Sequence, residues 1–349
     1  MLIVFYVSGH GFGHASRQIE LIRELRAQRP DVRIVVRTAV PRWMFAPIAD
    51  AAVEIQELET DPGVVQFDSI SLDEAETVRR AARFFAAFDH RVTVEAALIR
   101  GLRARLIVGD IPPLACAAAA RAGVPCVAVG NFTWDWIYSV YPAFDQLAPE
   151  VIPATQRAYA TATSALRLPL HGGFAPMAGV IHDIPLIARK SNRDAAETRR
   201  KLGLDSTRPI VLTSFGRYGA NLPIESLRQA GRLTVLDVPR EPPAGLLYQD
   251  LVAAADVVIS KPGYGIVSEC AANGTALLYT SRGRFIEYDV FVEEMPRLLR
   301  CRFIAQDDLL AGRWDESIER LLAQTPPPAQ PRIDGASVAA RELIAIAGA

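Results

Sequence analysis

Two histidines stand in a glycine-rich segment near the start of the chain, Ser8-Gly9-His10-Gly11-Phe12-Gly13-His14. The segment joins an apolar run, residues 2–7, that we predict to be a strand to an amphipathic helix predicted over 16–26. Ligands of open α/β sheets bind beyond the carboxyl ends of the strands, where glycines let the backbone approach them. We therefore predict that His14, together with His10, Gly11, Phe12 and Gly13, lies at a ligand-binding turn. The alternative is a tight glycine turn that the histidines cap.

A carboxylate and an aromatic loop follow two later strands. Asp110 stands just after a predicted buried strand, 106–108, so it could meet the glycine-rich segment across the same crevice. A hydrogen bond between Asp110 and His14 would fix the imidazole tautomer and support general-base catalysis, although Asp is also a common helix N-cap. The loop after the next strand, 126–129, suits a sugar ring stacked on an apolar face, or else aromatic packing between two domains. The residues of this loop that could contact such a ligand are Asn131, Trp134, Asp135 and Trp136.

Two segments of the second half have the composition of phosphate-binding turns. Ser214-Phe215-Gly216-Arg217 follows the strand 210–213 and can present amides and an arginine to a phosphate. Ser260-Lys261-Pro262-Gly263-Tyr264-Gly265 opens a helix predicted over 266–273, whose first amides suit a diphosphate. Glu269 lies on the first turns of that helix, where it could accept both hydroxyls of a ribose or could only complement the helix dipole. The polar and aromatic segment 282–288 follows the last inner strand and is a further candidate for the site. The alternative is that this segment is only a solvated loop.

Strands and helices must bring these segments together. Short apolar runs alternate with amphipathic helices in both halves, which is typical of βαβ units and parallel sheets. Strands are predicted over 2–7, 32–37, 53–58, 106–108, 126–129, 210–213, 232–235, 257–259 and 276–279, and a long helical stretch over 71–102. Because little room exists for a crossover helix between Gly216 and Leu233, we expect a reduced C-terminal sheet. The predicted α/β architecture has two doubly wound domains, 1–184 and 185–325, facing each other across a cleft, and a linker with a terminal helix, 326–349.

The composition argues against several classes of function. The chain has 38 Lys and Arg against 39 Asp and Glu, so no excess of positive charge exists to attract nucleic acid. No apolar run reaches the roughly 20 residues of a membrane helix and no secretory signal is recognisable, which predicts a cytoplasmic protein without an integral membrane segment. The four cysteines include no CxxC pair, so neither a zinc site nor a disulfide framework is predicted. His14 stands where the dinucleotide pattern GxGxxG requires glycine, which disfavours a dehydrogenase.

Several segments together resemble the N-terminal, glycosyltransferase-like domain of plant L-arabinokinases and its stand-alone bacterial relatives. The matching segments are GHGFGHASR, GDIPPLA, NFTWDWIY, KPGYGIVSE and RFIEY, which occur in the family's order and cover nearly the whole chain. No counterpart of the kinase part of the plant fusion is recognisable, so kinase activity is not implied. More widely, the chain is similar to inverting GT-B transferases, which implies two Rossmann-like domains, a terminal helix that packs back on the first of them, and a nucleotide-sugar donor.

The resemblance also implies roles for particular residues. In such transferases a histidine after the first strand deprotonates the acceptor and a later aspartate orients it, which here are His14 and Asp110. The implied donor-binding residues are Ser214, Phe215, Gly216, Arg217, Tyr248, Lys261, Gly263, Tyr264, Gly265, Ser268, Glu269, Glu287 and Tyr288. The implied function is inverting transfer of a sugar from a nucleotide-activated donor to an unknown hydroxyl acceptor, without cofactor or metal. A non-catalytic sugar or nucleotide sensor and a GT-B sugar-nucleotide epimerase are the alternatives.

Overall fold

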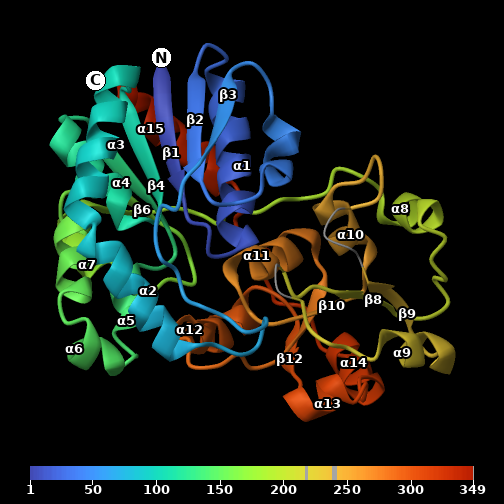
Figure 1. Cartoon of the computed structure of the whole chain (residues 1–349). Helices are drawn as coiled ribbons and strands as arrows, with labels where there is room; N and C mark the ends of the chain where they lie inside the picture. The colour runs from blue at the N-terminus through green and yellow to red at the C-terminus, as the bar shows by residue number, and fades with distance from the viewer. Residues whose placement is uncertain (217–218, 238–241, 349) are drawn as a thin grey trace.

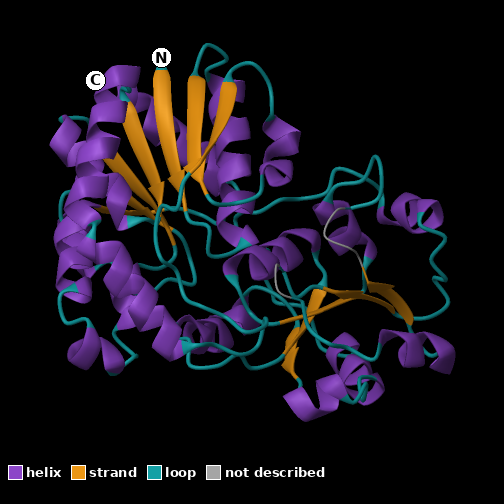
Figure 2. Ribbon diagram, in the orientation of Figure 1, coloured by secondary structure: helices purple, strands orange, loops and turns teal. Residues whose placement is uncertain are grey.

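The computed structural model describes residues 1–216, 219–237 and 242–348, and its strands form two parallel sheets (Figures 1 and 2). The first sheet has seven strands: β1 (Leu2–Val7), β2 (Arg33–Thr38), β3 (Val53–Glu57), β4 (Leu106–Asp110), β5 (Cys126–Gly130), β6 (Ser164–Arg167) and β7 (Ile181–Asp183). The second has five: β8 (Ile210–Thr213), β9 (Thr234–Asp237), β10 (Val257–Ser260), β11 (Ala276–Tyr279) and β12 (Cys301–Phe303). The second sheet is therefore the smaller one, as the short crossover predicted.

Each sheet has one point at which the order of its strands reverses. The first sheet runs β3-β2-β1-β4-β5-β6-β7 and reverses between β1 and β4, and the second runs β12-β11-β10-β8-β9 and reverses between β8 and β10. Connections leave in opposite directions on either side of such a point, which opens a crevice beyond the carboxyl ends of the strands. His14 follows β1 and Asp110 is the last residue of β4, while Ser214 and Lys261 follow β8 and β10. The topology therefore places all four candidate segments at the two crevices.

Helices cover both faces of the first sheet (Figure 2). Alternate residues of β1 enter different cores: Phe5 packs in the same core as Ile22 of α1 (Phe12–Gln28), and Tyr6 in the same core as Ala118 of α4 (Pro113–Ala122). The other helical segments of this part are η1 (Arg42–Ile48), α2 (Glu74–Ala86), α3 (Phe88–Leu102), α5 (Trp134–Tyr138), α6 (Ala143–Leu147), α7 (Val151–Tyr159) and η2 (Ala175–Val180).

The second sheet carries shorter helices. They are α8 (Ala195–Lys201), α9 (Ile224–Ala230), α10 (Tyr248–Ala254), α11 (Tyr264–Asn273), α12 (Glu287–Glu294), η3 (Met295–Arg297), α13 (Gln306–Leu310) and α14 (Asp315–Leu322). In the described part of the crossover between β8 and β9, α9 is the one helix, and it is seven residues long. Among the described residues, none of the helices combines the length and the hydrophobicity that crossing a bilayer requires.

The terminal helix α15 (Gly335–Gly348) returns to the first sheet and packs against α1 (Figure 1). Its Leu343 is fully buried in the core that also holds Ile22. The amide of Gly335 donates to the carbonyl of Leu186 at 3.0 Å, and a Cβ at Gly335 would collide with the backbone of Pro185. The end of the chain is thus tied to the segment that leads from the first sheet to the second.

Several element boundaries differ from the prediction. The helical stretch 71–102 is two helices that meet at Ala87, where the backbone leaves the helical region. No elements were predicted for the mixed segment 142–184, which contains α6, α7, β6 and β7, and the last strand, β12, was not predicted either. Helices α1 and α11 begin at Phe12 and Tyr264, earlier than the apolar periodicity indicated. Their early starts place His14 and Gly265 inside first helical turns rather than in the preceding loops.

Candidate active site

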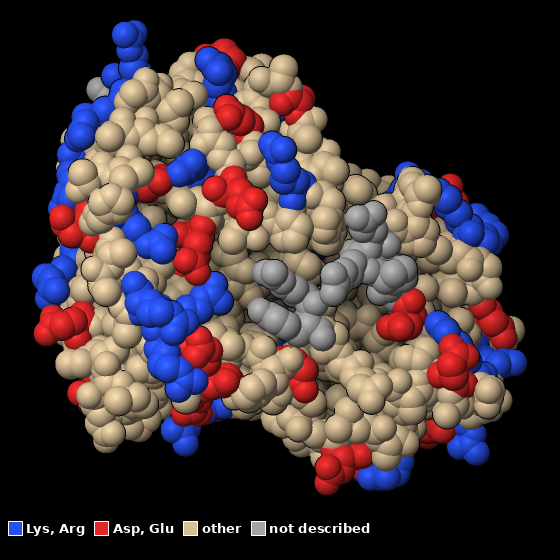
Figure 3. Space-filling view, in the orientation of Figure 1, with Lys and Arg blue, Asp and Glu red and all other residues tan. Residues whose placement is uncertain are grey.

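A cavity of about 700 Å³ lies between the segments that follow the strands of the two sheets. Figure 3 shows the hollow between the two lobes, on a face where Lys and Arg are interspersed with Asp and Glu. From the first half, the cavity is lined by the predicted residues His10, Gly11, Phe12, Gly13, His14 and Asn131. From the second half, it is lined by the predicted residues Ser214, Phe215, Gly216, Tyr248, Lys261, Gly263, Tyr264, Gly265, Glu269 and Glu287. His14 and Glu269 therefore line one cavity from opposite halves of the chain.

Some predicted residues do not line this cavity. Asp110 is fully buried behind His14, and Ser268 lies in a smaller adjoining recess. Tyr288 packs near Tyr279, with the ring centroids 6.5 Å apart, away from the lining. Arg217 lies outside the described residues.

His14 and Asp110 form a hydrogen-bonded pair at the reversal point of the first sheet. The Nδ1 atom of His14 lies 2.8 Å from Oδ1 of Asp110. Burial alone would raise the pKa of Asp110, but the charge and hydrogen bonds of Arg17 lower it to about 2, so the carboxylate is ionised. An ionised carboxylate only accepts hydrogen bonds, so Nδ1 of His14 carries a proton, and in the neutral form of the ring Nε2 keeps its lone pair. Nε2 makes no hydrogen bond with any described residue, which leaves it able to accept a proton from a hydroxyl group in the cavity.

Arg17 completes this pair, and the sequence analysis did not single it out. Its Nε donates to Oδ2 of Asp110 at 2.6 Å and its Nη2 to Oδ1 at 2.5 Å, while Nη1 donates to Oδ1 of Asn131 at 2.7 Å. The guanidinium also lies 4.9 Å from the ring centroid of Tyr264, which belongs to the second half. Its place three residues after His14 puts both side chains on one face of α1, and this spacing is the signal that could have found it.

His10 is held differently from His14 and cannot take over its role as base. Its Nδ1 accepts a hydrogen bond from the amide of Val64 at 3.2 Å. Its ring stacks on Phe285 at a centroid distance of 6.0 Å and meets the edge of Trp134 at 5.2 Å. Burial lowers the pKa of His10 well below its ordinary value, so the ring is neutral. It therefore forms part of the cavity wall.

The structure does not bring Trp134, Asp135 and Trp136 to the cavity. Trp134 is fully buried, with its ring stacked on Tyr138 at 5.6 Å. The ring of Trp136 packs so closely on Gly172 that no Cβ could fit there. These side chains support the wall from behind and pack on residues of the first half, Tyr138 and Gly172, rather than between two domains. Asn131 of the same loop does line the cavity.

The first turns of α1 and α11 meet backbone to backbone across the cavity wall. A Cβ added to Gly265 would lie 3.1 Å from the Cα of Gly13. Both helices have a glycine at the N-cap, Gly11 and Gly263, so no side chain caps their first amides. Uncapped first-turn amides and the helix dipole favour an anionic group at each helix start.

Replacing Gly265 with alanine is expected to lower the free energy of unfolding by about 1–3 kcal/mol, because the new methyl group overpacks the contact between the helices. Gly101→Ala is the matched control, since Gly101 is also helical but a Cβ there meets nothing within 4 Å. That control should gain about 0.5–1 kcal/mol from helix propensity. Denaturant unfolding measures both variants, and equal effects would show that the two helix starts are not in tight contact.

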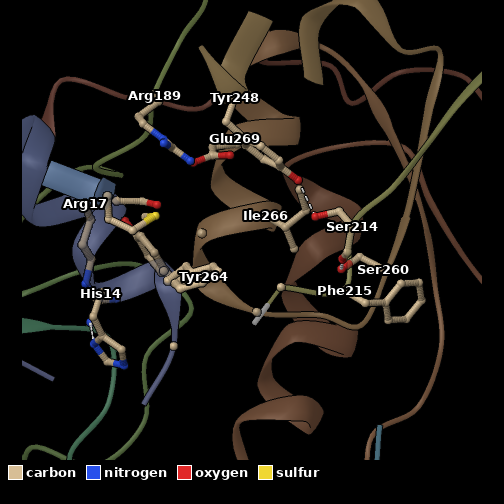
Figure 4. A pocket seen from close by; sticks show the side chains of 18 of the residues that line it. His14, Arg17, Arg189, Ser214, Phe215, Tyr248, Ser260, Tyr264, Ile266 and Glu269 are labelled. Carbon is tan, nitrogen blue, oxygen red and sulfur yellow. Dashed lines mark hydrogen bonds and ion pairs between the residues drawn. The ribbon is translucent and has the colours of Figure 1, made fainter. Parts of the chain in front are cut away.

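Glu269, the predicted ribose ligand, forms an ion pair with Arg189, which the sequence analysis missed (Figure 4). Nε of Arg189 donates to Oε1 of Glu269 at 2.7 Å, and Nη2 lies 2.5 Å from the same oxygen. Oε2 makes no hydrogen bond with any described residue, although the side chain lines the cavity. Burial raises the pKa of Glu269, while Arg189 opposes that rise. The carboxylate is thus held by one oxygen and offers the other to a ligand.

The turn after β8 is fixed by hydrogen bonds to its neighbours. The hydroxyls of Ser214 and Tyr248 are hydrogen-bonded (Figure 4), and the hydroxyl of Ser260 donates to the carbonyl of Ser214. The amide of Ser214 donates to the carbonyl of Ile259 at 2.9 Å. These bonds place Ser214 and Tyr248 beside Glu269 in a polar part of the cavity, which we call the ribose end.

A second cluster of polar side chains, from elements other than those of the first cluster, also lines the cavity. Nζ of Lys261 donates to Oε1 of Gln66 at 3.2 Å, and Nδ2 of Asn131 donates to Oε1 of Glu287 at 2.7 Å. Arg282 lies near Glu287, with Nη1 4.0 Å from Oε2. We call Gln66, Lys261, Arg282 and Glu287 the cationic end of the cavity. Gln66 and Arg282 were not predicted as site residues.

Comparison with solved structures gives the fold its name. The chain superposes with a TM-score of 0.60 on a UDP-glucosyltransferase from Polygonum tinctorium that glucosylates indoxyl, at 13% identity, covering 100% of this chain and 98% of that one. UGT2 from Phytolacca americana, solved with UDP-2-fluoro-glucose and pterostilbene, has a TM-score of 0.59 at 14% identity, covering 99% and 94%. The chain has the GT-B fold. A UDP-N-acetylglucosamine 2-epimerase shares this GT-B architecture, with a TM-score of 0.54 at 12% identity, covering 100% and 97%.

A similarity in sequence connects this GT-B chain to one curated protein. It is 30% identical to L-arabinokinase of Arabidopsis thaliana over 93% of its own length and 32% of that protein. The chain thus spans about a third of the length of this relative. No protein-family model matches the chain.

Proposed function

We propose that the chain is a glycosyltransferase that moves a sugar from a nucleotide-activated donor to a hydroxyl group, with inversion at the anomeric carbon. One observation carries the proposal: His14, with its tautomer fixed by Asp110, lines the same cavity as Glu269 and the start of α11. A base on one wall and a candidate nucleotide site on the other is the arrangement that sugar transfer needs. The neighbours described as UDP-glucosyltransferase and as a complex with UDP-2-fluoro-glucose support a nucleotide-sugar donor.

We assign the donor to the second half of the chain. The diphosphate would accept hydrogen bonds from the first-turn amides of α11 and lie close to Lys261. The ribose hydroxyls would donate to the free Oε2 of Glu269. Amides and a cation aimed at the diphosphate stabilise the charge that develops as it leaves. These groups supply the stabilisation without a metal, which is part of the proposal.

The acceptor would enter on the side of His14. As its hydroxyl oxygen bonds to the anomeric carbon, its proton passes to Nε2 of His14, and Asp110 stabilises the imidazolium that forms. The bond from the anomeric carbon to the diphosphate oxygen breaks, and its electron pair leaves with the nucleoside diphosphate. A single displacement from the opposite face inverts the configuration. The proposed domains, 1–184 and 185–325, would close around both substrates and exclude water.

Thermal unfolding with a panel of nucleoside diphosphates and nucleotide sugars, with and without EDTA, tests the proposal. A ligand at about a hundred times its Kd should stabilise the protein by about 2.7 kcal/mol. We expect one base to stabilise the chain irrespective of EDTA, and transfer or slow hydrolysis of the matching sugar donor. Binding without any turnover would favour the sensor, and epimerised free sugar or nucleotide sugar would favour the epimerase. No binding by any nucleotide would refute the proposal.

Replacing Glu269 with glutamine is expected to weaken binding of the nucleoside diphosphate by about tenfold or more, because a hydrogen bond to a charged group contributes about 1.5–3 kcal/mol. Calorimetry measures the affinity. Glu293→Gln is the control, since Glu293 is exposed on α12 and does not line the cavity. Unchanged affinity in Glu269→Gln would mean that the carboxylate only pairs with Arg189.

A further inference from the structure

The cationic end of the cavity carries more positive than negative charge. The other arginines that line the described cavity have carboxylate partners: Arg17 with Asp110, Arg189 with Glu269, and Arg23 with Glu20 at 3.0 Å. Lys261 and Arg282, in contrast, have no carboxylate oxygen within hydrogen-bond distance: Oε2 of Glu287 lies 4.0 Å from Arg282, and Lys261 donates to the neutral side chain of Gln66. One oxygen of Glu287 already accepts from Asn131 at 2.7 Å. Among the residues that the structure describes, both cations at this end therefore lack a hydrogen-bonded carboxylate partner.

The lack of hydrogen-bond partners is clearest at Arg282. It is only 6% exposed, and its Nε is buried without a hydrogen-bond partner in the described parts of the chain. Its nearest carboxylate oxygen, Oε2 of Glu287, is 4.0 Å from Nη1, beyond hydrogen-bond distance. Cζ of the guanidinium lies over the ring of Phe285, 3.8 Å from its centroid. Burial lowers the pKa of Arg282 from its usual value. A buried cation without hydrogen bonds destabilises the folded protein unless a ligand accepts hydrogen bonds from it.

Lys261 likewise lacks a carboxylate within hydrogen-bond distance among the described residues. Its ammonium group donates to Gln66, a neutral side chain, at 3.2 Å. Burial, together with the nearby charge of Arg282, lowers the pKa of Lys261 well below its usual value. The other carboxylate near Lys261 is Asp68, which already accepts from the hydroxyl of Ser71 at 2.7 Å. An anion bound between the two cations would relieve the repulsion between them.

We propose that Arg282 binds an anionic group that a substrate carries in addition to the diphosphate of the nucleotide, a carboxylate or a phosphate monoester, and that Lys261 lies between this group and the diphosphate. This rests on the proposed function, because the start of α11 and the ribose end are left to the nucleotide. Arg282 comes from the segment after β11, a different element from the helix start that would hold the diphosphate. A guanidinium with free donors suits bidentate binding of a planar carboxylate or of a phosphate. The group belongs either to the donor sugar or to the acceptor.

Calorimetry with the whole chain tests both sources. In the donor arm, UDP, UDP-glucose and UDP-glucuronate are titrated separately. In the acceptor arm, glucose, glucuronate and glucose 6-phosphate are titrated into protein saturated with UDP. We expect the acidic ligand of one arm to bind about 10- to 100-fold more tightly than its neutral counterpart, and Arg282→Met to abolish that preference. Arg284→Met is the control, because Arg284 is exposed in the same segment.

The outcomes separate this inference from the proposed function. If UDP binds but neither arm shows a preference for the acidic ligand, the anion site is wrong and the nucleotide site stands. If Arg282→Met weakens UDP itself, Arg282 is a ligand of the diphosphate and the inference is also wrong. If neither UDP nor any other nucleoside diphosphate of the panel binds, both proposals lose their support. Ligand-free Arg282→Met should unfold at an unchanged or higher temperature, since it loses a buried, unpaired charge; a clear drop would assign Arg282 to the fold instead.

Discussion

Replacing His14 with alanine is expected to lower the rate of sugar transfer by about 10²- to 10⁴-fold, the usual cost of losing a general base. Binding of the nucleoside diphosphate should change little, because the groups assigned to it lie in the second half of the chain. Asp110 remains paired with Arg17 in this variant, so the fold should persist. Steady-state kinetics and calorimetry measure the two effects separately.

Two further measurements make this result specific to the imidazole. Added imidazole should restore part of the activity of His14→Ala, since a free base can occupy the vacated space. His90→Ala, at an exposed position, should behave like the wild type. Full activity in His14→Ala would assign the base to another group and would contradict the mechanism.

The substitution Asp110→Asn is expected to destabilise the fold by about 3–5 kcal/mol as well as to abolish activity. Asp110 supplies the counter-charge of Arg17, and removing one partner of a buried ion pair leaves the other charge uncompensated. An Asn side chain keeps the size of the residue, so the loss measures charge rather than packing. Denaturant unfolding gives the free energy. A loss below about 1 kcal/mol would mean that Arg17 finds another partner.

The dependence of stability on pH gives a second test of Asp110. Its folded pKa of about 2 lies below the ordinary 3.8, so its contribution is complete above about pH 4 and is lost as the pH falls towards 2. That contribution amounts to about 2 kcal/mol, which Asp110→Asn should lack. Asp61 acts in the opposite direction, because burial raises its pKa to about 6, so the folded state gains stability as the pH falls from 6 to 4. The two windows do not overlap, and unfolding between pH 2 and 7 separates them.

The positions of the main motifs could be predicted from the sequence because they depend on local patterns. An apolar run followed by glycines and a helix puts His14 and Lys261 at the ends of parallel strands, and the structure places both at reversal points of their sheets. The α/β class and the smaller second sheet follow from the same alternation of strands and helices. Asp110 needed one further assumption, that two strand ends distant in sequence are neighbours, and the pairing of β1 with β4 fulfils it.

The residues that the sequence missed are defined by partners far along the chain. Arg17 and Arg189 look like surface charges until their carboxylates, Asp110 and Glu269, are placed beside them. The burial of Arg282 depends instead on how its own segment folds, which brings the guanidinium to 3.8 Å from the ring centroid of Phe285. Periodicity carries no information on such contacts, nor on which side of a wall an aromatic ring lies. This is why Trp134 seemed a candidate sugar platform, whereas it packs behind His10.

The configuration of the product tests the central claim most directly. Proton NMR can follow the anomeric signals while the purified chain reacts with the nucleotide sugar that stabilises it and with a panel of hydroxyl acceptors. Direct displacement assisted by His14 predicts a product of opposite anomeric configuration to the donor, formed without the transient appearance of another sugar nucleotide, and formation of that product at least about 10²-fold more slowly by His14→Ala. A product that retains the donor's configuration, or a sugar epimerised without transfer, would contradict the assignment of this cavity to an inverting glycosyltransferase.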